Sequence, residues 1–72
     1  MIAKRLNEIL DRTTISWHGH TMDVLREIER LAENVDLKLD IGNAISAGQR
    51  GEEMFARDYL NKARLRAENL KV

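Results

Sequence analysis

The sequence predicts an all-α fold: one small domain of three or four helices over residues 1–72, ending in a long helix. Apolar residues recur at helical spacing through most of the chain, opposite charges stand four residues apart, and proline is absent. Seventy-two residues are too few for two hydrophobic cores, so we expect a single domain. The alternative is an α+β fold with a short strand at residues 35–41.

Residues 2–12 are predicted to form a short amphipathic helix. Its apolar side chains share one face, formed by Ile2, Leu6, Ile9 and Leu10. A helix of this length is marginal on its own, so it must dock on another part of the chain.

Residues 13–20 interrupt the helical pattern with β-branched residues, a serine and a glycine, which disfavour a helix interior. The next helix is expected from Thr21 to about residue 34. Ser16 or Thr21 could cap it, and Thr21 is preferred because Gly19 then stays outside the helix. Its apolar stripe is broad enough to contact two neighbouring helices and comprises Val24, Leu25, Ile28, Leu31, Ala32 and Val35.

Residues 35–41 alternate between apolar and polar, as a half-buried strand does. Leu37, Ile41 and Ile45 also fit one face of a helix, and leucine favours helix over strand. A strand would need a pairing partner, which only residues 13–17 offer. We therefore predict a third helix over residues 36–47 and keep the strand as the alternative.

Residues 51–70 have the clearest helical period in the chain. Apolar residues four and three positions apart form a seam typical of packed helices: Ala56, Leu60, Ala63, Ala67 and Leu70. Phe55 and Tyr59 lie at the edge of that face. Three opposite-charge pairs support the helix, namely Glu53–Arg57, Asp58–Lys62 and Arg64–Glu68. We expect the second and last helices to pack antiparallel, with the first laid across them.

Composition excludes several classes of protein. The absence of cysteine rules out disulfides and thiolate metal sites, and it is typical of a cytoplasmic protein. No apolar run approaches the ~18 residues that a membrane span needs. Residues 1–10 are amphipathic and include an acidic side chain, so we expect neither a secretory signal nor a transit peptide.

The sequence offers no catalytic constellation, and we expect neither an enzyme nor a cofactor. Ser16 and Ser46 lack a strand–turn–helix elbow, and no glycine-rich phosphate loop is present. His18 and His20 would point the same way in an extended segment, as ligands of zinc, nickel or copper could. A closed site needs about four ligands, however, so we predict solvated loop histidines and no metal.

Three apolar side chains are candidates for binding a protein partner. Met54 and Leu65 point away from the C-terminal seam, either as isolated exposed residues or as a second contact surface. Trp17, the only tryptophan, either covers the core or anchors an interface. Because the core of such a short chain is thin, self-association is a natural source of stability. We therefore predict a protein–protein interaction module, acting as a regulator, inhibitor or assembly factor and forming a homo-oligomer.

The alternative function is that of a dimeric nucleic-acid-binding regulator. Twelve basic and twelve acidic side chains cancel overall, which argues against non-specific coating of nucleic acid. Residues 57–72 nevertheless carry five basic against two acidic side chains, and the basic ones are Arg57, Lys62, Arg64, Arg66 and Lys71. These positions flank the seam, where charges normally pair with a neighbouring helix, and the expected partners are Glu27, Glu29 and Glu33.

Overall fold

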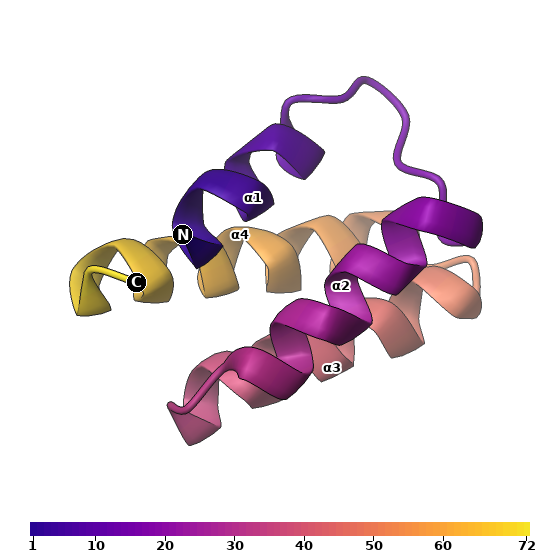
Figure 1. The fold of residues 1–72 in the computed structure, drawn as a ribbon. Coiled ribbons are helices and arrows are strands. Elements are labelled where there is room, and N and C mark those ends of the chain that lie inside the picture. The colour runs from indigo at the N-terminus through magenta and orange to yellow at the C-terminus, as the bar shows by residue number, and fades with distance from the viewer.

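Four helices and no strand make up the computed structural model, which describes residues 1–72 (Figure 1). The helices are α1 (Ile2–Leu10), α2 (Gly19–Leu31), α3 (Val35–Gln49) and α4 (Glu53–Leu70). The predicted all-α fold is confirmed. The helix predicted over residues 36–47 is also confirmed, and the alternative strand at 35–41 does not form.

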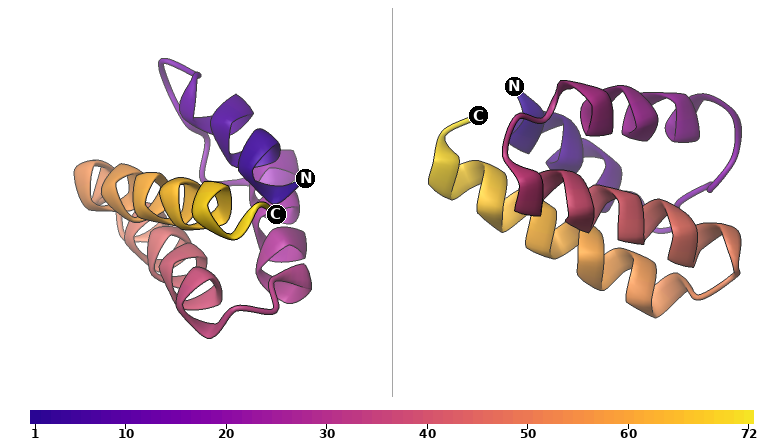
Figure 2. Two further views of the ribbon diagram at one scale, coloured as in Figure 1. Left: turned by 90° about the vertical axis from the view of Figure 1, so that its left-hand side faces the viewer. Right: turned by 90° about the horizontal axis from the view of Figure 1, so that it is seen from below.

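α3 and α4 form an antiparallel hairpin and share the most extensive helix contact in the molecule (Figure 2). At the end of α3, the N–H of Gly51 donates to the carbonyl of Gly48 (3.1 Å), and the N–H of Glu52 donates to that of Ala47 (2.9 Å). This pattern closes a helix and requires a left-handed residue, which is Gly51 with φ of 81°. The hairpin turn is therefore built around one glycine.

The predicted seam of α4 is confirmed except at its last position. Its buried members face α3 and α1, and they are Ala56, Leu60, Ala63 and Ala67. Leu70, the last residue of the helix, is exposed. Opposite the seam, α3 contributes larger side chains to the core, namely Leu37, Ile41 and Ile45.

The predicted packing of the second helix against the last is wrong. The main contacts of α4 are with α3 and α1, and α2 packs mainly on α3. Short connections at residues 32–34 and 50–52 make consecutive helices antiparallel neighbours, so α3 lies between α2 and α4. Of the stripe predicted for the second helix, Leu31 and Val35 are exposed. Leu31 is the last residue of α2, and Val35 is the first residue of α3 and not part of α2.

The ends of α2 also differ from the prediction. The helix begins at Gly19, after the extended residue His18, and neither Ser16 nor Thr21 caps it. Thr21 is instead buried inside the helix, where its hydroxyl accepts a hydrogen bond from Arg12 (2.7 Å). The next helix has a side-chain cap, because the N–H of Leu37 donates to Oδ1 of Asn34 (2.9 Å).

α1 lies across α4, one of the two helices that it was predicted to cross, and it brings the N-terminus beside the C-terminus (Figure 2). Leu6 and Ile9 are its buried side chains. The N–H of Ala3 donates to the carbonyl oxygen of Val72 at 3.0 Å, which joins the first turn of α1 to the end of α4.

α4 ends with the same hydrogen-bond pattern as α3, although its left-handed residue is Lys71 with φ of 60°. A lysine in this conformation costs free energy that a glycine does not. We expect Lys71→Gly to raise the free energy of unfolding by about 0.5–1 kcal/mol and Gly51→Ala to lower it by about 1 kcal/mol, measured by urea denaturation.

Lys71→Ala is the matched control, since it removes the same charge and keeps the strained backbone. If Lys71→Gly were no more stable than Lys71→Ala, backbone strain at this position would be contradicted.

Candidate partner-binding surface

Trp17, one of the three predicted contact residues, lies in the core. Its side chain is 6% exposed and rests on Gly48 near the end of α3. A Cβ atom at Gly48 would overlap the ring carbons of Trp17, so the indole occupies the space that any other residue would fill. In the single chain, the ring faces α3 rather than solvent.

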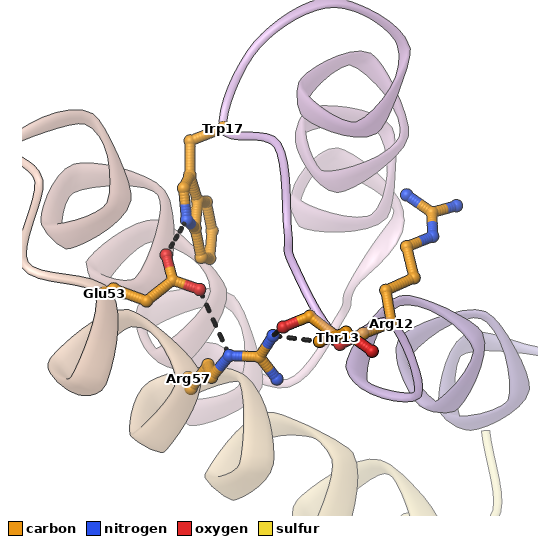
Figure 3. A network of polar contacts seen from close by, with 5 residues as sticks. All are labelled: Arg12, Thr13, Trp17, Glu53 and Arg57. Atoms are coloured by element: carbon orange, nitrogen blue, oxygen red, sulfur yellow. Dashed lines mark hydrogen bonds and ion pairs between the residues drawn. The ribbon is translucent and has the colours of Figure 1, made fainter.

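The indole N–H of Trp17 begins a network of polar contacts that joins the α1–α2 loop to α4 (Figure 3). It donates to Oε2 of Glu53 at 2.6 Å, and the other carboxylate oxygen accepts from Nε of Arg57 at 3.1 Å. Arg57 in turn donates to the carbonyl oxygens of Arg12 (2.9 Å) and Thr13 (2.8 Å). The network thereby attaches the first turn of α4 to the loop at two places, at Trp17 and at residues 12–13.

Met54 and Leu65, the other two predicted contact residues, lie on the outer face of α4. Their exposed fractions are 80% and 48%. Phe55, predicted at the edge of the buried face, is 62% exposed and belongs to the outer face instead. On the helical wheel, Phe55 lies about 110° from the centre of the buried seam, too far round the helix for α3 and α1 to cover it.

The exposed residues of this face have their own helical spacing of three and four positions. They form a surface that we call the outer seam, made of Phe55, Asp58, Lys62, Leu65 and Asn69, with Met54 beside it. Two shallow hollows flank it. One, of about 420 Å³, is lined by Phe55, Asp58, Tyr59, Asn61 and Lys62. The other, of about 250 Å³, is lined by Lys62, Leu65, Arg66 and Asn69.

The two charges of the outer seam have no ion-pair partner within the chain. The predicted Asp58–Lys62 pair does not form, because Nζ of Lys62 lies over the ring of Tyr59, 5.5 Å from its centre. The other two predicted pairs are confirmed: Arg57–Glu53 at 3.1 Å and Arg64–Glu68 at 3.2 Å. Asp58 is therefore an unpaired carboxylate in the middle of an exposed helix face.

A second apolar surface lies at the end of the bundle where the termini meet. It is a groove of about 390 Å³ lined by Ile2, Leu31, Glu33, Asn34, Leu37, Leu70 and Val72. The groove could not be predicted from the sequence, because its apolar side chains come from four separate segments and only the tertiary structure brings them together. The one feature in the sequence that these apolar side chains share is that most of them lie at or near the end of a predicted helix.

Three of the five basic residues that were candidates for binding nucleic acid form ion pairs within the chain. Arg66 donates to Asp40 at 3.1 Å and lies 3.7 Å from Asp36, both on α3. The predicted pairing of these bases with Glu27, Glu29 and Glu33 is therefore wrong, since α3 rather than α2 lies beside α4. Glu27 pairs with Arg5 of α1 instead (2.9 Å).

His18 and His20 stand at the start of α2, with no close set of ligands around them. No three side chains of histidine, aspartate and glutamate lie close enough together to hold a metal ion. All buried side-chain nitrogen and oxygen atoms have hydrogen-bond partners.

Comparisons of the chain with protein-family models, with curated proteins and with solved structures find no match. None of the four helices is both long enough and apolar enough to cross a membrane.

The contact of Trp17 with Gly48 yields a stability prediction. Gly48→Ala places a methyl group inside the indole, so we expect it to lower the free energy of unfolding by about 1–3 kcal/mol, measured by urea denaturation. Because the ring must move toward solvent, its fluorescence emission should shift to longer wavelength.

Gly42→Ala is the matched control in the same helix. Its Cβ would meet only the end of the flexible Glu29 side chain, so the better helix propensity of alanine should leave stability unchanged or raised. Equal stability of the two variants, with unshifted fluorescence, would contradict the packing of Trp17 on Gly48.

Proposed function

We propose that this chain is a small protein–protein interaction module, acting as a regulator, inhibitor or assembly factor, and that it binds through the outer seam of α4. The observation that carries this proposal is the exposure of Met54, Phe55 and Leu65 on a helix whose opposite face already fills the core. Large apolar side chains grouped on one face are typical of contact surfaces. The proposal assigns this chain a binding role and no catalytic one.

The spacing of the outer seam favours a helical partner. Positions separated by three and four residues meet a second helix along its length, as in coiled-coil packing. The hollows beside Phe55 and Leu65 offer room for side chains of such a helix. The polar members of the seam, Asp58 and Lys62, add charges that select the partner and its orientation.

Trp17 contributes to the outer seam indirectly, because it holds the start of α4 in place. Its hydrogen bond to Glu53 fixes the first turn of α4, and Met54 and Phe55 are the next two residues. A surface held in place before binding loses less conformational entropy when the partner arrives. In the proposal, Trp17 therefore positions the contact residues and does not itself touch the partner.

Nucleic-acid binding receives less support than protein binding. Arg57, Arg64 and Arg66 are engaged in ion pairs within the chain, which leaves fewer cations to contact phosphates. The acidic residues Asp58 and Glu68 lie on the same helix and oppose an approaching phosphate backbone.

Site-specific photo-cross-linking in the cells that make the protein tests the proposal. We expect a photoreactive residue in place of Met54 to give a protein adduct, because that side chain is 80% exposed beside the outer seam. The adduct should disappear when Leu65→Glu is added, since a carboxylate in a desolvated contact costs binding energy.

The same residue in place of Leu39 is the control, because Leu39 is 57% exposed on α3 and lies outside the outer seam. Adduct formation at position 54 that does not exceed the level at position 39 would contradict the proposed contact surface.

A further inference from the structure

We propose that the outer seam of α4 pairs with the same seam of a second copy of this chain, antiparallel and about a two-fold axis. This inference rests on the proposed function in one respect: it takes the outer seam as the contact surface. It goes further by naming the partner and the orientation.

The order of residues along the seam makes it complementary to itself. With the two-fold axis level with Leu60, Phe55 of one copy lies opposite the partner's Leu65, and Asp58 lies opposite the partner's Lys62. The symmetry repeats both contacts, so two aromatic–aliphatic pairs enclose two ion pairs. Between Phe55 and Leu65, each residue at the centre of the outer seam then faces a residue of the second copy with which it can form an apolar contact or an ion pair.

Charge complementarity selects the antiparallel orientation. Asp58 and Lys62 have no ion-pair partner within the chain, although their spacing would allow them to pair with each other. The first half of α4 has two acidic side chains against one basic, and the second half has three basic against one acidic. Antiparallel pairing brings unlike halves together, and parallel pairing would place Asp58 against Asp58 and Lys62 against Lys62.

The available area limits the strength of this dimer. A standard interface removes about 800 Å² from each partner, which is a large share of the 4616 Å² surface of this chain. One face of one helix lies at the low end of that range, and only two apolar pairs occupy it. We therefore expect a dissociation constant of about 1 µM to 1 mM rather than a permanent dimer.

Sedimentation equilibrium of the purified chain, at about 1 µM to 1 mM and at low salt, tests the dimer. The native chain should change from monomer to dimer over this range. Leu65→Glu should weaken the association at least tenfold, because it puts a carboxylate opposite Phe55 of the partner. Leu39→Glu, the same change on an exposed leucine of α3, should leave the dissociation constant within twofold.

Charge exchange tests the orientation. Asp58→Lys and Lys62→Asp should each weaken the antiparallel dimer, because each places like charges opposite one another. The double variant Asp58→Lys with Lys62→Asp should restore it, since the pairs are reversed and complete. In a parallel dimer, the single variants would remove no favourable pair and the double variant would rescue nothing. Circular dichroism and thermal unfolding check that every variant keeps its fold.

The outcomes separate this inference from the proposed function. A native chain that stays monomeric throughout, or a dimer that Leu65→Glu does not weaken, overturns the proposed dimer. If a cross-linker at position 54 then still yields an adduct with a different protein, the contact surface stands and only the identity of the partner is wrong. If no adduct forms either, both proposals fall. A dimer weakened by Leu65→Glu and rescued by charge exchange supports both.

Discussion

The close approach of α3 and α4 is the contact on which the rest of the fold depends. Both helices bury small residues: Ala44 and Ala47 on α3, and Ala56, Ala63 and Ala67 on α4. Dispersion attraction falls steeply with separation, so two helices with few large side chains between them gain stability only when their backbones lie close. Larger side chains such as Ile41 and Leu60 then fill the remaining space.

Gly48 and the polar network show how the open end of this hairpin is closed. The absence of a side chain at Gly48 lets the indole of Trp17 reach the α3 backbone, and burial of the indole N–H requires an acceptor. Glu53 supplies it, and the charge of Glu53 is balanced by Arg57, whose Nη2 donates to two loop carbonyls. Polar groups of this irregular loop thus have hydrogen-bond partners although the loop forms no helix or strand, because each residue of the network supplies a partner for the next.

The sequence predicted the fold class, the helix at residues 36–47 and most of the α4 seam, because periodicity reports which side chains of a helix turn inward. It placed the second helix against the last instead of against the third, since an inward face does not show which helix covers it. Leu31, Val35 and Leu70 are exposed although their spacing places them on apolar faces, and each is the first or last residue of its helix.

The same limits apply to the candidate surface. Met54 and Leu65 could be recognised as lying off the seam, but the place of Phe55 depended on where α3 and α1 sit against α4. The unpaired state of Asp58 depended on Lys62 taking Tyr59 as its contact, which spacing alone does not specify. The hydrogen bond of Trp17 to Glu53 joins residues 36 positions apart, a distance that no local pattern spans.

The contact of α1 with α4 has a consequence for the order in which the chain folds during synthesis. α3 packs on α2, which precedes it, and α4 packs on α3, so these contacts close over short stretches of chain. α1 is the exception, because its main partner is the last helix and its first turn bonds Val72. A helix of nine residues does not persist alone. α1 leaves the ribosome before its partner helix and is therefore the last of the four helices to become stable, and Leu6 and Ile9 stay in contact with water or chaperones until α4 has emerged.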